Sequence, residues 1–271
     1  MPRTINGRQF QWQLLEQVGK GDAGEVLRVQ AQPGSVTALM KRPVQNASGG
    51  TILRQAVQIE NEGQILASLK GLDASRNGLL VHTPLLLDQS IPGTTQTASL
   101  FIVSEEVPGV AISSLLKQRL QEDVSLSHVL VLRVLSGLFL LLERAHDFGI
   151  AWNDVKMEHI FWDETNGKLS FIDWGNGLFL SAQPLTNGKD PAWLDYQQFI
   201  SEGNLLLNQI APELIAELDW PASAAQLTKE DLTQLQLRTE YLLSSLSMRV
   251  IDYQVLFRKQ VQSIHNLDEL S

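Results

Sequence analysis

The sequence contains an ordered series of short motifs whose residue types suit the handling of phosphate groups. The first motif is rich in glycine, and a backbone without Cβ atoms can close over phosphates and donate N–H groups to them. A lysine and a glutamate follow, and a loop with acidic and basic residues comes much later. In chain order the motifs are Gly19-x-Gly21-x-x-Gly24-x-Val26, Lys41, Glu62, Trp152-Asn153-Asp154-Val155-Lys156-Met157-Glu158-His159 and Asp173-Trp174-Gly175. Each is weak alone, but together and in this order they are typical of phosphoryl transfer.

The glycine-rich motif is expected to lie in a β-hairpin. Residues 10–18 and 25–32 alternate between apolar and polar side chains, and these two runs flank the glycines. Pro33-Gly34 is a turn signal, and residues 35–41 form a third candidate strand. A dinucleotide-binding loop would instead join a strand to a helix, so this context argues against a dinucleotide fold.

The pattern of the chain changes after Val107-Pro108-Gly109, which is the natural boundary between two parts. Before it we expect a helix at 53–69, ended by Gly71, and apolar runs of strand length at 79–87 and 100–104. After it we expect helices at 112–120, 126–146 (with Ser125 as its N-cap), 191–208, 212–219 and 229–264, and a hairpin at 161–171 around Asn166-Gly167. A small β-rich part with one helix therefore precedes a larger helical part.

In order, spacing and context, the motifs resemble the ATP site of the protein-kinase family. The resemblance covers nearly the whole chain but fades after about Asp195. It implies an α+β, two-lobed protein-kinase-like fold over residues 1–271, with a small antiparallel β-rich N-lobe (1–106) that has one helix, a hinge (105–109) and a larger α-helical C-lobe (110–271). The Asp-x-Lys arrangement resembles serine/threonine protein kinases more than tyrosine or aminoglycoside kinases.

The resemblance also implies where a nucleotide would bind. The nucleotide-binding positions are Gly19, Gly21, Gly24, Val26, Lys41, Glu62, Glu105, Val107 and Phe161. Lys41 would hold the α- and β-phosphates, and Glu62 would pair with it from the helix. The backbone of Glu105 and Val107 would bind adenine beside Ser104, which occupies the gatekeeper position.

The catalytic and metal-binding roles fall on the two later motifs. Asp154 would accept the proton of the substrate hydroxyl and orient it for in-line attack, while Lys156 would neutralise the transferring phosphoryl group. Asp173 would coordinate Mg²⁺ bridging the β- and γ-phosphates. His159 takes the place of the family's metal-binding asparagine. Because imidazole is a softer ligand than an amide oxygen, Mn²⁺ is an alternative to Mg²⁺.

Several positions depart from the family pattern. Leu39 replaces an alanine that lies against adenine, and Asp22 places a carboxylate at the tip of a loop that faces phosphates. Trp152 replaces a histidine of the internal apolar spine. Asn153 replaces the arginine that reads a phosphorylated loop, so no activating phosphorylation is expected.

The segment after Asp173 permits two alignments. In one, Ala211-Pro212-Glu213 closes an activation segment. In the other, which we favour, Asp195 is the helix residue that braces the catalytic loop. The segment from Asp173 to Asp195 is then short, as in atypical and small-molecule kinases. Neither alignment provides an evident peptide-binding platform.

Composition narrows the classes of function. A net charge of −9 over 271 residues disfavours nucleic-acid binding, and the lack of cysteine excludes disulfides, thiol nucleophiles and thiolate metal sites. The first residues contain no apolar signal region, and the apolar run at 129–142 is too short and interrupted to span a bilayer. We therefore expect a cytoplasmic protein whose partners are ATP and a hydroxyl group of a protein or a small molecule. Its oligomeric state stays open.

The motifs favour an active, atypical bacterial-type serine/threonine kinase, because Lys41, Glu62, Asp154, Lys156 and Asp173 are all present. The first alternative is a catalytically weak pseudokinase that acts as a nucleotide-binding or scaffold module, motivated by His159, Leu39 and Asp22. The second is a small-molecule kinase, motivated by the weak resemblance after Asp173.

Overall fold

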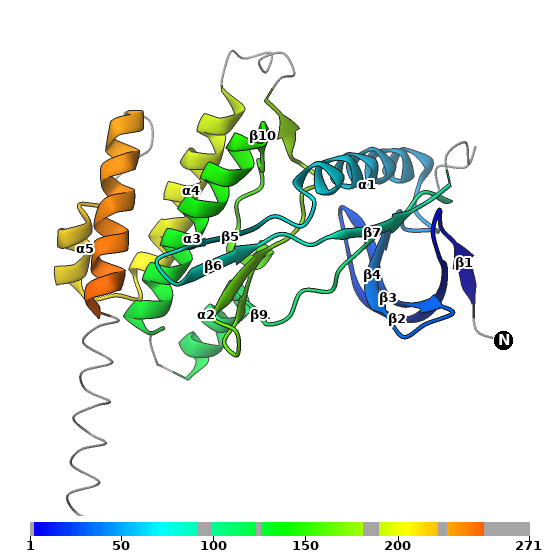
Figure 1. The fold of residues 1–271 in the computed structure, drawn as a ribbon, viewed down its shortest axis with the longest axis horizontal. Helices are drawn as coiled ribbons and strands as arrows, with labels where there is room; N and C mark the ends of the chain where they lie inside the picture. Colours follow the sequence, from blue (N-terminus) through cyan, green and yellow to red (C-terminus); the bar gives the residue numbers. More distant parts are fainter. Residues whose placement is uncertain (1–2, 92–98, 123–125, 181–189, 222–226, 247–271) are drawn as a thin grey trace, which may run out of the picture.

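The computed structural model describes residues 3–91, 99–122, 126–180, 190–221 and 227–246. The architecture is α+β, with a curled antiparallel sheet at one end of the molecule and most of the helices at the other (Figure 1). This arrangement is consistent with the predicted order of a small β-rich part and a larger helical part. Among the helices that the structure describes, none combines the length and the apolar character that crossing a bilayer requires.

The first sheet has six antiparallel strands in the order β1-β2-β3-β4-β8-β7. They are β1 (Thr4–Asn6), β2 (Gln11–Gly21), β3 (Gly24–Gln32), β4 (Thr37–Arg42), β7 (Leu86–Gln89) and β8 (Ile102–Ser104). The three strands predicted around the glycines are confirmed, and β1 is an edge strand that the sequence pattern does not reveal. One face of β3 and β4 packs in a small core with Trp12 and Met40, and the period of two places Leu39 and Lys41 on the other face.

Helix α1 (Gly49–Leu69) lies across one side of this sheet and packs against β4, β7 and β8 (Figure 1). It begins earlier than predicted, at an N-cap formed by the side chain of Ser48. Gly49 and Gly50 hide this start in the sequence, because glycine is a poor helix former. The predicted end is confirmed, since Gly71 follows the helix with a φ of 64°.

A second sheet has five strands in the order β5-β6-β12-β11-β9. They are β5 (Asp73–Arg76), β6 (Leu79–His82), β9 (Val110–Ala111), β11 (Ile160–Asp163) and β12 (Lys168–Phe171). The predicted hairpin around Asn166-Gly167 is confirmed as β11–β12. The apolar run at 79–87 is divided between two sheets: β6 pairs in parallel with β12, whereas β7 pairs with β8. Pro84 separates the two strands, because proline has no N–H to continue a ladder.

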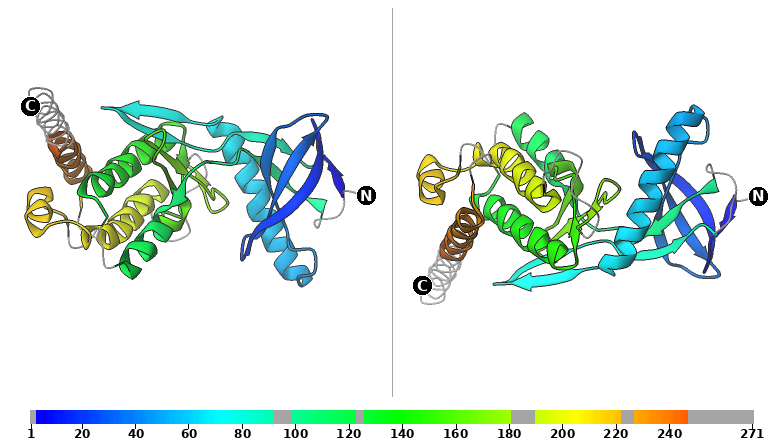
Figure 2. Two further views of the ribbon diagram at one scale, coloured as in Figure 1. Left: turned by 90° about the horizontal axis from the view of Figure 1, so that it is seen from below. Right: turned by 90° about the horizontal axis from the view of Figure 1, so that it is seen from above.

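The β5–β6 hairpin connects the end of α1 to the helical part, along which it extends in both views of Figure 2. Its turn is Asn77-Gly78, with φ angles of 52° and 77°. Arg76 at the end of β5 forms ion pairs with Glu143 and with Glu240 of the helical residues 229–246. The hairpin therefore joins the two parts of the molecule through its ion pairs and through the pairing of β6 with β12, in addition to the covalent connection along the chain.

The helical part is built around α3 (His128–Asp147), which is buried on most sides, as predicted. The other elements are α2 (Ile112–Gln121), α4 (Pro191–Leu207), α5 (Pro212–Leu218), a helix at 229–246, the pair β10 (Ile150–Ala151) and β13 (Leu178–Phe179), and the 3₁₀ turn η2 (Met157–His159). The N-cap of α3 is Ser127, whereas the predicted cap, Ser125, lies outside the described residues. The last predicted helix is described only as far as residue 246.

Candidate active site

The residues predicted to bind nucleotide, bind metal or catalyse transfer all line one cleft between the six-stranded sheet and the helical part. The cleft has a volume of about 850 Å³. Its walls include Gly19, Gly21, Gly24, Val26, Lys41, Glu62, Glu105, Val107, Asp154, Lys156, His159, Phe161 and Asp173. Residues that are distant in the sequence are thus brought within reach of one ligand.

Lys41, on the cleft face of β4, contacts two carboxylates at once. Its Nζ lies 2.7 Å from Glu62 Oε2 on α1 and 2.7 Å from Asp173 Oδ1. Burial opposes the charge on Lys41, but the two carboxylates outweigh it and raise the pKa of this lysine. Burial also opposes ionisation of Asp173, yet the Lys41 ammonium lowers the pKa of this aspartate. For Glu62 burial dominates and raises the pKa.

The glycine-rich turn joins β2 to β3 at the sheet side of the cleft. Gly24 has a φ of 129°, and a Cβ there would collide with the carbonyl oxygen of Arg42. The backbone itself therefore requires glycine at this position. Gly19 and Gly21 have no atom within 4 Å of the place where a Cβ would lie, so the space around them is open. Asp22, at the tip, also lines the cleft.

The segment after β8 forms a further wall, lined by Ser104, Glu105 and Val107. The N–H of Glu105 is bonded to the backbone of the segment before β7. Within the described parts of the chain, the Glu105 carbonyl oxygen and the Val107 N–H have no such partner. Leu39, which pairs with Ser104 across β4 and β8, borders the same space, and Phe161 reaches it from β11.

Asp154 lies on the opposite wall, in the loop after β10. Its Oδ1 is 2.7 Å from Lys156 Nζ, and its Oδ2 accepts a hydrogen bond of 3.2 Å from Asn176 Nδ2. The hydrogen bond to Asp154 raises the pKa of Lys156, so this lysine is charged at neutral pH. The Lys156 side chain is 47% exposed and that of Asp154 only 12%. A shielded carboxylate and a solvent-facing cation therefore lie side by side.

Helix α4 supports this loop from behind. Asp195 accepts hydrogen bonds from the backbone N–H groups of Trp152 (2.8 Å) and Asn153. On the same helix, Gln198 and Glu202 accept hydrogen bonds from two later N–H groups of the loop, at 2.9 Å and 3.1 Å. Four backbone N–H donors between Trp152 and Met157 are thus satisfied by side chains of one helix.

The structure supports the alignment in which Asp195 braces the loop. Asp195 is fully buried, and His146 at the end of α3 also contacts its carboxylate, at 2.9 Å. In contrast, Ala211-Pro212-Glu213 forms the start of α5 and does not line the cleft. These contacts favour the alignment through Asp195 over the one through Ala211-Pro212-Glu213.

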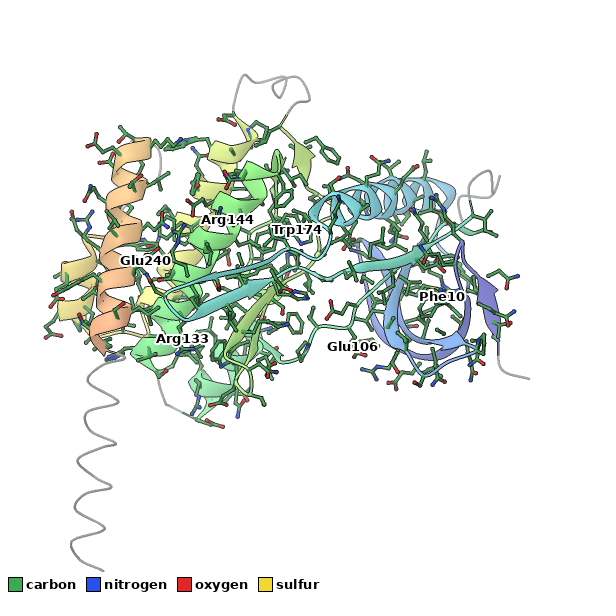
Figure 3. The ribbon with its side chains drawn as sticks, in the orientation of Figure 1. Phe10, Glu106, Arg133, Arg144, Trp174 and Glu240 are labelled. Atoms are coloured by element: carbon green, nitrogen blue, oxygen red, sulfur yellow. The ribbon has the colours of Figure 1, made fainter. Side chains whose placement is uncertain are left out.

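The Asp173-Trp174-Gly175 motif forms a tight turn after β12. Asp173 has a φ of 58°, and its carbonyl oxygen accepts a 3.2 Å hydrogen bond from the indole N–H of Trp152. The Trp152 and Trp174 rings stack with their centroids 5.4 Å apart. Trp174 is fully buried near the point where α1 meets the helical part (Figure 3). Trp152, which departs from the family pattern, therefore packs on Trp174, and the two rings together hold the turn.

Three amide side chains that the motifs do not single out join α1 to this turn. Asn61 Nδ2 donates to the carbonyl oxygens of Gly175 and Gly177, at 3.0 Å and 2.9 Å. Gln58 Nε2 donates to Asn176 Oδ1 at 2.9 Å, and Asn176 donates in turn to Asp154. A hydrogen-bonded path thus runs from α1 to the candidate base. The sequence contains no motif that reveals this path, because its residues lie far apart along the chain and because amide side chains are common on helix surfaces.

Asp154, His159 and Asp173 offer ligand atoms that all lie within 4.8 Å of one another. His159 Nε2 is 3.6 Å from Asp173 Oδ2. Carboxylate and imidazole groups are common ligands of divalent ions. The donor set therefore fits a divalent ion beside Asp173.

Comparison with known proteins gives a distant relation. No family model matches the sequence. The serine/threonine-protein kinase PknD of Chlamydia trachomatis serovar D and the PknD of serovar A are each 26% identical to this chain over 187 residues. The match covers 66% of this chain but 18% of each relative, so the chain spans only a small part of the relatives' length. The similarity indicates a kinase-like relation, in agreement with the order of the motifs.

Proposed function

We propose that this chain is an ATP-dependent phosphotransferase, and specifically a serine/threonine protein kinase that uses Mg²⁺- or Mn²⁺-ATP. The observation that carries the proposal is the convergence of Lys41, Asp154 and Asp173 on one cleft, with Glu62 paired to the lysine. These are the charged groups that phosphoryl transfer by a kinase requires. The distant likeness to PknD supports the same class of enzyme.

The proposed domain covers residues 1–271, with an N-lobe (1–106), a hinge (105–109) and a C-lobe (110–271). The first sheet and α1 belong to the N-lobe, and α2 to α5 belong to the C-lobe. The second sheet takes strands from both, because β6 pairs with β12. This pairing favours lobes that stay close together, with the cleft already assembled.

The base of ATP would lie between Leu39 and Phe161. Among the described residues, the carbonyl oxygen of Glu105 and the N–H of Val107 have no backbone partner. The first can accept a hydrogen bond from the adenine amino group, and the second can donate to a ring nitrogen. A guanine presents a carbonyl oxygen where adenine presents its amino group, so the same backbone groups disfavour GTP. Adenine is therefore the base that this wall suits.

The phosphates would lie under the glycine-rich turn and beside Lys41. Open space at Gly19 and Gly21 lets the backbone approach them closely. Asp173 and His159 would hold the divalent ion, which neutralises phosphate charge when bound. Lys41 keeps one oxygen of Asp173 engaged at 2.7 Å and so leaves the other oxygen for the ion.

The acceptor hydroxyl would approach Asp154. The carboxylate accepts the hydroxyl proton while the hydroxyl oxygen forms a bond to the γ-phosphorus and the bond from that phosphorus to the bridging oxygen of ADP breaks. Asn176 and Lys156 orient the Asp154 carboxylate by hydrogen bonds of 3.2 Å and 2.7 Å. Lys156 also offers its charge to the transferred group.

The two alternatives to a protein kinase make different predictions. A pseudokinase binds nucleotide without transferring phosphate, and the features that favour it are Leu39, Asp22 and His159, which all line the cleft. A small-molecule kinase transfers phosphate to a small alcohol but not to a protein, and the early start of α4 after Asp173 is the feature that favours it. Binding and transfer must therefore be measured separately.

A thermal-shift titration with ATP, with and without Mg²⁺ and Mn²⁺, tests binding. Transfer from γ-labelled ATP to protein and small-alcohol acceptors tests activity. Asp173→Ala should abolish transfer and the metal-dependent part of the stabilisation, because the ion loses its carboxylate ligand. Asp147→Asn, at an exposed position on α3, is the matched control and should retain both. Unchanged stabilisation of Asp173→Ala by Mg²⁺-ATP would contradict the proposal.

A further inference from the structure

We propose that His159 binds the divalent ion directly through Nε2, and that the site therefore prefers first-row transition cations such as Mn²⁺ and Co²⁺ over Mg²⁺. This inference rests on the proposed function, because the phosphates of ATP would supply most of the remaining ligands. It gives the imidazole a defined role at a position where the resembled family has an amide.

The hydrogen bond of the other ring nitrogen determines which nitrogen is free. His159 Nδ1 lies 3.1 Å from the backbone carbonyl oxygen of Asp154. A carbonyl oxygen can only accept a hydrogen bond, so Nδ1 carries the hydrogen of the neutral ring and Nε2 keeps its lone pair. Metal-binding histidines commonly have this arrangement, with one ring N–H tied to a carbonyl and the other nitrogen on the ion.

This ring nitrogen lies next to the second carboxylate oxygen of Asp173. His159 Nε2 is 3.6 Å from Asp173 Oδ2, whereas Asp173 Oδ1 is occupied by Lys41. The two atoms are close enough to serve as ligands of one divalent ion. Glu158 Oε1 is also 3.7 Å from Nε2, but its side chain is 63% exposed and can turn to solvent.

The ring is held in this position from several sides. His159 is buried, and its backbone N–H donates to the Lys156 carbonyl oxygen at 3.0 Å. Its own carbonyl oxygen accepts a 3.0 Å hydrogen bond from the N–H of Ile172. The Trp152 ring lies 6.4 Å away, centroid to centroid. A ligand that is fixed before the ion arrives binds it with little further ordering.

The choice of cation follows from the ligand type. Mg²⁺ prefers an octahedron of oxygen atoms and gives up its water reluctantly. A nitrogen ligand favours first-row transition ions, more strongly for Co²⁺ than for Mn²⁺. Replacement of the imidazole by an amide removes that advantage. We expect the ratio of Mn²⁺ to Mg²⁺ affinity to fall by about tenfold in His159→Asn, because the nitrogen ligand that favours Mn²⁺ is lost.

Pulsed electron paramagnetic resonance detects the proposed bond directly. The full chain is loaded with Mn²⁺ and a non-hydrolysable ATP analogue, and the ¹⁴N coupling of a directly bound imidazole is recorded. The wild type should show this coupling and His159→Asn should lose it. His128→Asn, which makes the same substitution at the first residue of α3, should retain it. Bound Mn²⁺ without nitrogen coupling in the wild type would overturn the inference, and this measurement needs no variant to fold.

Affinities for the ATP analogue with Mn²⁺, Co²⁺ and Mg²⁺ separate this inference from the proposed function. A ratio that falls in His159→Asn and in His159→Gln, but not in His128→Asn, supports direct binding. Equal ratios in all four proteins would overturn the inference and leave the kinase proposal standing. Binding of the analogue that no metal improves, in the wild type, would contradict both. Circular dichroism of each variant confirms that the compared proteins are folded.

Discussion

The two walls of the cleft are held in different ways. On the sheet side the residues are held by a buried network of charges. Its centre is Lys41, which is 13% exposed and lies 2.7 Å from the carboxylates of Glu62 and Asp173. On the helical side backbone hydrogen bonds to α4 position the loop, and the cation of that wall, Lys156, is 47% exposed. Removing one partner of a buried ion pair strands a charge, whereas removing one acceptor of several leaves the others in place. Substitutions on the sheet side should therefore affect both stability and chemistry, whereas a substitution of Asp154 on the helical side should affect mainly chemistry.

Lys41→Met should have the largest effect. Two shielded carboxylates lose their shared cation, so we expect the free energy of unfolding to fall by about 3 kcal/mol and turnover to drop strongly with the fold retained. Denaturant unfolding and γ-phosphate transfer measure the two effects. Adding Glu62→Gln to Lys41→Met should recover part of the stability but none of the turnover. The control is Lys117→Met, which makes the same substitution at an exposed position of α2. Wild-type turnover in Lys41→Met would contradict the role of this lysine.

Asp154→Asn tests the other wall. The amide cannot accept the hydroxyl proton, so we expect turnover to fall by about 10²- to 10⁴-fold. Binding of Mg²⁺-ATP and the unfolding midpoint should stay close to wild type, because the network around Lys41 is untouched. Equilibrium binding, thermal unfolding and transfer are measured on the same preparation. A loss of ATP binding as large as the loss of turnover would show that the two walls are not independent.

Asn176→Ala should have a smaller effect that links the two walls. It removes the donor to Asp154 Oδ2 and the contact with Gln58, so α1 no longer helps to orient the base. We expect kcat to fall by about tenfold, the equivalent of one lost hydrogen bond to a charged group, with KM for ATP unchanged. Asn46→Ala, at an exposed position before α1, is the control. An unchanged kcat would mean that Lys156 alone positions Asp154.

Gln198→Ala should weaken the support of the catalytic loop only slightly. One backbone N–H of the loop loses its acceptor, and we expect a loss of about 1 kcal/mol in unfolding free energy and a few-fold loss of kcat. Asp195→Asn should be more damaging, because this fully buried carboxylate accepts two backbone hydrogen bonds and contacts His146. Equal effects of the two substitutions would argue against Asp195 as the principal brace.

Phosphatase treatment should have no effect on activity. Asn153 provides no charge for a phosphate on the segment after Asp173, and its side chain is already engaged with the Asn176 carbonyl oxygen at 3.1 Å. The test compares the activity before and after phosphatase treatment. Mass spectrometry establishes the phosphorylation state of both samples. An enzyme silenced by the phosphatase would show that another cation reads the phosphate.

Elements with strong local signals could be predicted from the sequence. The hairpin that carries the glycines, the long helix α3 and the β11–β12 hairpin follow from period-two alternation, helical spacing and the Asn166-Gly167 turn, which are properties of neighbouring residues. The start of α1 could not be predicted in this way, because Gly49 and Gly50 have low helix propensity and the Ser48 cap overrides it. The Asn77-Gly78 hairpin has a local turn signal, but no local signal reveals its parallel pairing with β12.

The sequence by itself determined which chemical groups are available and in what order, and the motif residues from Gly19 to Asp173 already indicated phosphoryl transfer. Only the tertiary structure decided how they meet, with Lys41 between Glu62 and Asp173, Asp195 behind the loop and Asn176 on Asp154. The physical reason is the distance along the sequence over which each kind of signal acts. Periodicity and turn propensity act over a few residues, whereas these contacts depend on the packing of α1, α3 and α4 around buried tryptophans. That packing is a property of the whole chain.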